Sequence, residues 1–407
     1  MSFARTAVLS VDLASGMKDL HVQPGYGQAQ VLFRYRGSPL CNVRMKVVEG
    51  RIRAVELWSA AWSHRDTQLQ TSVLSDVLSA NERLPVGDRK LPSATIVVCT
   101  RNRPADLRRC LESIAPQLSD SVEALIIDNN PSDNETEKLV AKYPVRYYRE
   151  NRPGLNWARA RAAQLARTEL LLFTDDDVAL DSDWSNQMRI PFADQLVAAV
   201  AGAVAPMEFE HASQELYEQY GGFYRGYSVK VFNLMNTVAV GAGRVGAGAS
   251  MAVRRSLAVG MRLFEWELDC GTPSYSGGDF FAFYQLIRAG YDIVYWPDAL
   301  AWHRHRQTAA DLRNMLYGYG VGVYCVLLRC LFEHRDFDAL LLALNWFMQY
   351  HVREFVRALL RRPVARPVDL IWAEIRGVFH SPFAYRKVRA RERQLGPLPS
   401  PVGVEAA

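Results

Sequence analysis

Three consecutive carboxylates, Asp175, Asp176 and Asp177, follow an apolar run at residues 170–173. Like charges a few ångströms apart raise one another's pKa, so such a run is unfavourable unless a cation lies among them. Mg²⁺ and Mn²⁺ prefer carboxylate oxygens and take substrate phosphates as further ligands. The run therefore predicts a divalent-cation site, and the alternative is a cluster that caps the following helix.

The carboxylates belong to a stretch in which short β-branched runs alternate with amphipathic segments. We expect strands at residues 95–99, 124–127, 145–148 and 170–173, and helices at residues 105–114, 134–142 and 155–166. This alternation predicts a parallel sheet with helices on its faces. In such a sheet ligands bind beyond the carboxyl ends of the strands, so the polar segments that follow the four strands should meet at one edge.

Several motifs of this stretch and of the residues that follow resemble the inverting glycosyltransferases of family 2, whose nucleotide-sugar-binding domain has the GT-A fold. The resemblance extends from about residue 93 to residue 306, roughly half of the chain. The motifs are TIVVCTRNRP (95–104), LIIDNN (125–130), NRPG with Ala158 and Arg159 (151–159), FTDDDV (173–178), GAGASMAVRR (246–255), SGGDF (276–280) and YWPDALAWHRH (295–305). Each motif alone is weak, whereas the ordered series is specific.

The resemblance implies a set of donor-binding residues. Asp128 would hydrogen-bond the nucleotide base, and the cations would lie near the phosphates. Metal ligands for Mn²⁺ or Mg²⁺ would be Asp175, Asp177 and His303, with Asp176 and His305 as alternatives if the register differs. The nucleotide-sugar-binding residues implied in this way are Thr100, Arg101, Arg103, Asp128, Arg159, Asp175 and Asp176.

Asp279 would be the general base that takes a proton from an acceptor hydroxyl, because an alcohol is a poor nucleophile until a positioned base removes its proton. A single base without a protein nucleophile gives inversion at the sugar carbon. Gly278 stands where the family often has Glu, so we expect no carboxylate beside Asp279. At a second position, Ala160 stands where the family commonly has Asn. The alternative is that Asp279 only caps a helix expected at residues 280–289.

Before residue 91 the pattern of apolar and polar residues is different. Partly alternating runs at residues 30–35, 42–47 and 51–57 predict an antiparallel meander, followed by a helix at residues 68–80 and a linker at residues 84–93. We expect four parts: a small β-rich accessory domain with a linker helix at 1–90, a GT-A transferase domain at 91–306, a helical basic region at 307–393 and a flexible tail at 394–407. The predicted class is α/β, a Rossmann-like, mostly parallel sheet with these additions.

The 407-residue chain has a formal net charge of +5, and the positive charge is concentrated near its C-terminus. Between residues 353 and 393 the chain has eleven Arg and Lys but only four Asp and Glu. The part of the chain after residue 306 is expected to form helices at 312–330, 337–360 and 368–378. This charge predicts contact with an anionic membrane surface rather than nucleic acid; a solvated tail, or a helical cap on the transferase domain, are the alternatives.

The six cysteines form no C-x-x-C pair, and the N-terminus does not resemble a secretory signal. The apolar runs at 317–328 and 339–352 are shorter than the roughly 20 residues that cross a bilayer. We therefore expect a cytoplasmic protein, peripheral at the inner face of the cell membrane, without a transmembrane helix. No feature indicates the oligomeric state.

The sequence thus predicts a metal-dependent, inverting glycosyltransferase. A UDP-sugar is the expected donor, and the expected acceptor is a hydroxyl of a glycan or a lipid-linked glycan. One alternative is a sugar-phosphate nucleotidyltransferase, but that chemistry has no role for Asp279 or His303. A second alternative is a non-catalytic, membrane-associated scaffold, and the intact carboxylates of both acidic motifs argue against it.

Overall fold

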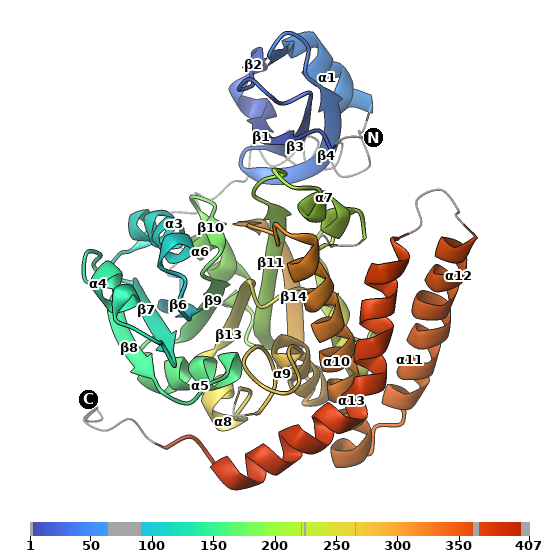
Figure 1. Ribbon diagram of the computed structural model, residues 1–407. Coiled ribbons are helices and arrows are strands. Elements are labelled where there is room, and N and C mark those ends of the chain that lie inside the picture. The colour runs from blue at the N-terminus through green and yellow to red at the C-terminus, as the bar shows by residue number, and fades with distance from the viewer. Residues whose placement is uncertain are drawn as a thin grey trace.

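The computed structural model describes residues 3–63, 91–220, 222–223, 225–264, 266–360 and 366–399. It consists of a small N-terminal β-rich unit, a central α/β body and a group of C-terminal helices, which follow one another along the chain (Figure 1). The helix expected at residues 68–80 and most of the expected linker lie outside the described residues.

Four parallel strands form one half of the central sheet, as predicted. Strand β6 pairs in parallel with β7 and β9, and β7 pairs in parallel with β8. The three connecting helices α3, α4 and α5 bring each strand back in the same direction, so the carboxyl ends of all four strands lie at one edge. The bounds are β6 (Ala94–Thr100), α3 (Pro104–Ile114), β7 (Val122–Asn129), α4 (Glu135–Val140), β8 (Arg146–Glu150), α5 (Leu155–Leu165) and β9 (Leu170–Asp175).

The two faces of this half-sheet bury alternate residues of each strand. On β6, Val97 packs in one hydrophobic cluster with residues of α5. Its neighbours Ile96 and Val98 face the other way, into a second cluster that contains Leu107 of α3. Because successive side chains of a strand point to opposite faces, a strand that is buried on both faces needs a continuous apolar run.

The other half of the sheet contains both parallel and antiparallel strand pairs. Strand β13 lies antiparallel between β9 and β11, and the long strand β14 pairs in parallel with β11 and antiparallel with β10 and β12. The β10–β14 register places Val178 opposite His303. The bounds are β10 (Val178–Leu180), α6 (Trp184–Arg189), β11 (Val197–Pro206), α7 (Ala212–Gln219), β12 (Lys230–Phe232), β13 (Ser250–Arg254), α8 (Arg255–Gly260), α9 (Gly278–Arg288) and β14 (Asp292–His303).

The N-terminal unit differs from the predicted meander in two ways. Strand β1 pairs in parallel with β3, and only β3 and β4 form an antiparallel hairpin. The strand expected at residues 51–57 ends after two residues, because Leu57 and Ala61 are buried one helical turn apart on α1 while Trp58 and Trp62 are exposed. The bounds are β1 (Thr6–Asp12), β2 (Leu20–His21), β3 (Gln28–Tyr35), β4 (Ser38–Lys46), β5 (Arg51–Ile52) and α1 (Ala54–Ser63).

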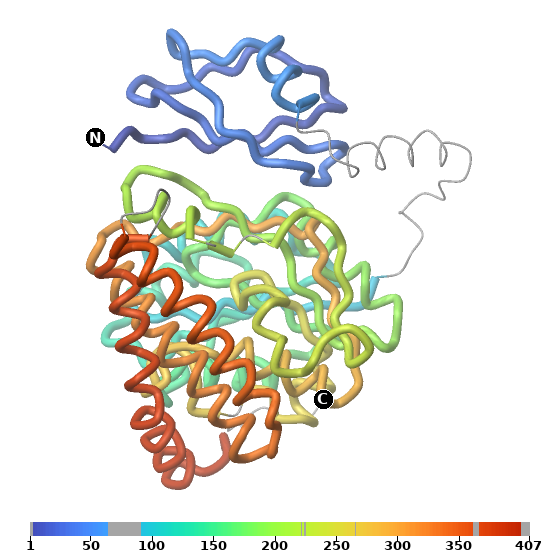
Figure 2. The backbone as a smooth tube through the Cα atoms, turned by 90° about the vertical axis from the view of Figure 1, so that its right-hand side faces the viewer, coloured from blue at the N-terminus to red at the C-terminus, as the bar shows by residue number. Residues whose placement is uncertain are grey.

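Polar contacts join the N-terminal unit to the central body, above which it lies in Figure 2. The guanidinium of Arg34 donates two hydrogen bonds to the carboxylate of Asp181, at 2.7 and 2.9 Å. Arg44 pairs with Glu215 at the start of α7. Charged and polar side chains therefore carry part of this contact, and the buried Leu32 of β3 adds an apolar part, since it belongs to the hydrophobic cluster of the central body.

The first and last of the C-terminal helices are longer than predicted, and the middle one is divided by a π-helical segment. Helix α10 (Ala309–His334) is followed by α11 (Asp338–Trp346), a π-helical segment (Phe347–Val352), α12 (Arg353–Leu359) and α13 (Val368–Leu395). The prediction that the last helix ends at residue 378 is wrong. Helix α13 continues past Pro382, whose missing N–H leaves the Val378 carbonyl without its helical donor, and the Ser381 hydroxyl donates to that carbonyl at 2.7 Å instead.

Two observations bear on the predictions of a chain without a transmembrane helix and of a flexible C-terminal tail. Helix α10 has 26 residues and contains an 18-residue window with a mean hydropathy of 1.5, so by length and composition it could cross a bilayer. It is the single such helix among the described residues, and 56% of that window is buried. The expected flexible tail is packed at its start, where the carbonyl oxygens of Gly396 and Pro399 accept hydrogen bonds from Arg152 and Arg161.

The fully buried Arg329 of α10 connects the C-terminal helices to the central body. Its guanidinium donates to both carboxylate oxygens of Glu392 on α13, at 2.7 and 3.0 Å, and lies 3.2 Å from Glu333. It also stacks on the rings of Trp266 and Phe281, with its central carbon 4.1 and 5.1 Å from their centroids. Arg389 of α13 lies 3.3 Å from Glu333 and 2.9 Å from Glu392, so two arginines balance the two carboxylates, and Arg329 also closes an aromatic layer.

We predict that Arg329→Met lowers the free energy of unfolding by about 3 kcal/mol, because it breaks a buried ion pair and leaves Arg389, which is 33% exposed, to balance both Glu333 and Glu392. The double variant Arg329→Met/Glu392→Met should recover part of the loss. Urea-induced unfolding followed by circular dichroism measures both values. Equal stability of Arg329→Met and the wild type would contradict this role.

Candidate active site

Three potential metal ligands converge at the carboxyl edge of the sheet. Asp175 ends β9, Asp177 precedes β10 and His303 ends β14, and one ligand atom from each residue lies within 4.8 Å of the other two. The His303 Nε2 atom is 3.2 Å from Asp177 Oδ1. Two carboxylates and one imidazole form a donor set that suits Mn²⁺ and is compatible with Mg²⁺, so the residues fit a divalent cation.

Asp176 points to a different set of partners. Its carboxylate accepts hydrogen bonds from the Thr100 hydroxyl at 2.7 Å and from Arg103 at 2.6 Å. Arg103 also donates to Asp177 and Asp106, at 3.0 and 2.9 Å. The structure therefore separates the three-residue run into a central carboxylate bound to Thr100 and Arg103 and two outer carboxylates beside His303.

The carboxylates at this edge have unusual pKa values. Burial and the charge of Asp177 raise the pKa of Asp175 to about 6 and that of Asp176 to about 7. Burial opposes ionisation of Asp177 as well, but His303, Arg103 and Arg306 outweigh it and hold its pKa well below the usual range. Asp177 in turn raises the pKa of His303 against the effect of burial. A divalent cation among these groups would stabilise all of the ionised carboxylates.

Arg159 of α5 is a second cation at this edge and, unlike Arg103, it is buried. It donates to Asp269 at 2.8 Å, and its side chain is 4% exposed. Burial lowers the pKa of Arg159, but Asp269, Asp175 and Asp279 together raise it above its ordinary value. The guanidinium therefore lies in the field of carboxylates from three different segments.

A carboxylate does stand beside Asp279, contrary to the prediction made from Gly278. A Cβ at Gly278 would collide with the carboxylate of Asp269 and the amide of Asn156. Asp269 thus occupies the space that a side chain at residue 278 would need, and it reaches this space from a turn nine residues earlier in a left-handed conformation with φ 82°. Burial and the nearby charge of Asp279 raise its pKa, although Arg159 opposes this rise.

Asp279 lies in the first turn of α9 and is half-buried. One carboxylate oxygen accepts the Gly248 N–H at 2.8 Å, and the other accepts the N–H of Phe280. The alternative that Asp279 only caps the following helix is wrong, because α9 begins at Gly278 and its N-cap residue is Gly277. Asp279 also faces a cavity of about 330 Å³ whose other walls include residues of α7, α10 and α13.

The remaining predicted donor residues have different surroundings. Asp128 is buried at the carboxyl end of β7, where its Oδ2 accepts the Tyr147 hydroxyl at 2.9 Å and its Oδ1 has no hydrogen-bond partner in the described structure. This free acceptor would suit a nucleotide base. The Arg101 side chain is exposed and is not drawn into the cluster. His305 does not contact the carboxylate run; its Nε2 lies 2.8 Å from Glu218 Oε1.

Two aromatic residues that follow α7 line different cavities. Phe223 stacks edge-on against His303, with ring centroids 4.9 Å apart, and it lines the cavity at Asp279. Tyr227 lines a different cavity, under the N-terminal unit. The third aromatic residue of this loop, Tyr224, lies outside the described residues.

Sequence reasoning missed Asp269, Asn156 and Glu218. A lone acidic residue in an irregular segment gives no periodic or motif signal, and Asp269 becomes recognisable only through its partner Arg159, 110 positions away. Glu218 occupies an unremarkable position near the end of α7, and only the fold brings it to His305. Asn156 was adjacent to recognised motif residues, and its position on the inner face of α5 was the available signal.

Residues 95–255 match the sequence model of Glycosyl transferase family 2. The chain contains a glycosyltransferase family 2 domain. Its 123-residue match to EpsH of Bacillus subtilis, named as a candidate glycosyltransferase, is 27% identical and spans 29% of this chain and 35% of that protein. The match to the O-antigen chain rhamnosyltransferase RfbN of Salmonella typhimurium is 24% identical over 249 residues, 57% of this chain and 72% of that protein. The chain thus spans about a third of the length of EpsH.

Two solved glycosyltransferase structures are similar to this structure. GalNAc-T7, crystallised with UDP, GalNAc and Mn²⁺, has a TM-score of 0.41 and 16% identity, covering 57% of this chain and 48% of that one. The mannosyltransferase PcManGT of Pyrobaculum calidifontis, in complex with GDP-Man and Mn²⁺, has a TM-score of 0.42 and 17% identity, covering 82% and 85%. The predicted family and the predicted α/β class with a helical C-terminal region are confirmed.

The separation of Asp176 from the potential ligands predicts different effects of three matched substitutions. Asp175→Asn and Asp177→Asn should each weaken Mn²⁺ binding by at least tenfold, since each removes a charged ligand. Asp176→Asn should weaken it less than threefold, because its partners are Thr100 and Arg103. Isothermal titration calorimetry in the presence of UDP measures all three. The strongest loss in Asp176→Asn would assign the ligands to the other register.

Proposed function

We propose that this protein is a metal-dependent, inverting glycosyltransferase that transfers a sugar from a UDP-sugar to an acceptor hydroxyl. The observation that carries the proposal is the arrangement of two distinct acidic sites at one sheet edge. Asp175, Asp177 and His303 form a potential metal site, while Asp279 faces a separate cavity. Donor and acceptor can therefore bind side by side, with the carboxylate of Asp279 on the acceptor side.

The donor side has the groups that a nucleoside diphosphate needs. Asp175, Asp177 and His303 would hold Mn²⁺ or Mg²⁺, which neutralises charge on the leaving diphosphate. Arg103 stands beside these ligands and supplies a further cation. The unpartnered oxygen of Asp128 is suited to a donor N–H of the base. The choice of UDP among nucleotides follows from the family resemblance.

Asp279 is suited to act as the base. Among the described residues, its neighbour Asp269 and Glu374, which lines the same cavity, are each paired with an arginine and are therefore poorly suited to be a nucleophile. Asp269 is held by Arg159 at 2.8 Å, and both side chains are buried. A base on the acceptor side takes the hydroxyl proton as the oxygen attacks the sugar carbon from the face opposite the diphosphate. A single displacement of this kind inverts the configuration at that carbon.

The cavity at Asp279 supports an acceptor with an apolar part. Its walls carry predominantly aromatic and aliphatic side chains from the C-terminal helices, including Leu316, Tyr319, Trp346, Tyr350 and Leu370. A sugar presents its hydroxyls to polar partners, whereas these side chains suit hydrocarbon. This lining fits a lipid-linked glycan or another glycan with an apolar aglycone.

The same proposal makes the protein a peripheral membrane protein of the cytoplasm, bound at the inner face of the cell membrane. Helices α11 and α12 form the outer layer of the C-terminal helices in Figure 1. Arg353 and Arg357 on α12 have side chains 63% and 43% exposed, which suits anionic headgroups. The exposed apolar side chains of α11, the π-helical segment and α12 are Leu340, Leu341, Leu344, Met348, Val356 and Leu359.

For catalysis we predict that Asp279→Asn lowers turnover by about 10²- to 10⁴-fold and leaves UDP affinity nearly unchanged, because Asn keeps the shape but takes up no proton. UDP release from UDP-sugars, with n-octyl glycosides as acceptor probes, gives turnover, and calorimetry gives UDP affinity. The exposed Asp120→Asn is the matched control. Product NMR should show the anomeric configuration inverted. Near wild-type turnover of Asp279→Asn would eliminate Asp279 as the base.

For the membrane surface we predict that the protein co-sediments with phosphatidylglycerol-containing vesicles and that salt weakens this binding by screening the charges. Leu341→Glu/Leu344→Glu should reduce it at least fivefold by placing charge on the apolar face of α11. Leu196→Glu, at an exposed leucine of the central body, is the control. If binding depends neither on the lipid charge nor on the double substitution, these helices are not the membrane-binding surface.

A further inference from the structure

A chain of hydrogen bonds leads from the potential metal site to a cleft under the N-terminal unit. His303 Nε2 faces Asp177, and on the other side of the ring His303 Nδ1 lies 3.0 Å from His305 Nδ1. His305 Nε2 lies 2.8 Å from Glu218 Oε1. Both rings are buried. Each of their nitrogens other than His303 Nε2, which faces Asp177, has one of these partners.

The carboxylate at the end of this chain determines where the protons lie. A carboxylate only accepts hydrogen bonds, so His305 must carry its proton on Nε2. The Nδ1 atom of neutral His305 is then an acceptor, and His303 must donate to it from its own Nδ1. In that tautomer the Nε2 atom of His303 has a free lone pair directed at the Asp177 side, where a metal ion would bind.

The surrounding residues hold this geometry. Tyr217 packs edge-on against His305 and Phe223 against His303, with ring centroids 4.7 and 4.9 Å apart. Gly222 leaves room for the Glu218 carboxylate, because a Cβ at this position would collide with it. Neither imidazole can therefore turn its nitrogens freely to other partners.

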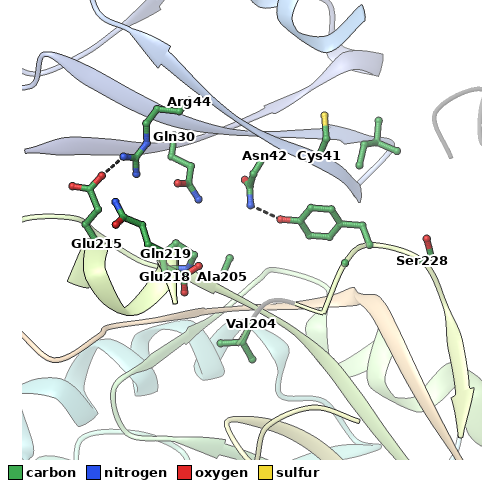
Figure 3. A pocket seen from close by; sticks show the side chains of 14 residues that line it. Gln30, Cys41, Asn42, Arg44, Val204, Ala205, Glu215, Glu218, Gln219 and Ser228 are labelled. Atoms are coloured by element: carbon green, nitrogen blue, oxygen red, sulfur yellow. Dashed lines mark hydrogen bonds and ion pairs between the residues drawn. The ribbon is translucent and has the colours of Figure 1, made fainter. Parts of the chain in front are cut away.

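Glu218 reaches this position from α7 and also lines the cleft shown in Figure 3. The cleft has a volume of about 660 Å³ and lies between α7 and strands β3 and β4 of the N-terminal unit. Glu215, one turn before Glu218, faces the same cleft but pairs with Arg44. Two carboxylates of one helix thus border one cleft, and one of them is bonded to the histidine pair.

We propose that Glu218 is a positioning residue of the metal site, which acts through His305 to keep the Nε2 lone pair of His303 available for a divalent cation. The inference rests on the proposed metal-dependent function and adds to it a residue outside the ligand group. It also makes the N-terminal side of the molecule part of the metal site, since Glu218 lies in the wall of the cleft.

Mn²⁺ binding to the whole protein, measured by calorimetry and by electron paramagnetic resonance of free Mn²⁺, tests this role without any assay of activity. Glu218→Met removes the acceptor at nearly constant volume and should weaken Mn²⁺ binding by about 10- to 100-fold, the usual effect of losing such an outer partner. Glu218→Gln keeps an acceptor oxygen and should stay within about threefold of the wild type. Glu215→Met, the control on the same helix and cleft, should leave Mn²⁺ affinity unchanged.

The outcomes are distinguishable from a failure of the proposed function. Wild-type affinity in Glu218→Met overturns the positioning role while the metal site stands. Equal losses in Glu218→Met, Glu218→Gln and Glu215→Met also overturn it, because they indicate a general disturbance of α7. No Mn²⁺ binding by the wild type would reject the metal-dependent function itself, and this inference with it. Pulsed paramagnetic resonance gives a second readout, since nitrogen modulation from His303 should be present in the wild type and reduced in Glu218→Met.

Discussion

Crowding of negative charge at one edge of the sheet is the constraint on which the rest of this structure depends. Asp175, Asp176 and Asp177 are adjacent in the chain, and Asp269 and Asp279 approach from other segments. Each carboxylate is buried or half-buried, so water alone cannot screen the repulsion. The edge is stable only because cations and hydrogen-bond donors stand at defined positions among these groups.

The elements around the edge supply these groups. The loop before α3 brings Arg103 to Asp176 and Asp177, and α5 brings Arg159 to Asp269. Strand β14, paired with β10, brings His303 to Asp177. The mixed half of the sheet is therefore as necessary to the site as the parallel half, since without β14 the outer carboxylates would lose their imidazole partner.

The C-terminal helices have two relationships to this site, and the sequence had set these as alternatives. They pack on the central body through the buried Arg329, as a helical cap would, and they also line the cavity that Asp279 faces. Their outer surface keeps exposed apolar side chains and arginines, which are the features that suggested a membrane contact. Cap and membrane surface are thus compatible, because inner and outer faces of the same helices carry different residues.

The sequence by itself determined the parallel half of the sheet and indicated most of the residues of the candidate site. Buried strands need β-branched apolar runs, and the polar segments that follow them must meet at one edge, so local pattern was sufficient there. Ordered motifs also identified Asp175, Asp177, His303 and Asp279 before any contact was known. In the N-terminal unit the same reasoning failed, because a two-residue strand and the following helix α1 give a similar short apolar signal.

Only the tertiary structure decided which of several equivalent residues meet. Three adjacent aspartates have the same local signal, and Thr100 and Arg103, more than 70 positions earlier, select Asp176 as the one turned away from His303. His303 and His305 differ in role because one faces Asp177 and the other Glu218, a partner 87 positions away. Asp269 fills the place of the side chain that Gly278 lacks, through a turn that no periodicity marks. Such pairings depend on long-range packing, and sequence pattern reports only on neighbours along the chain.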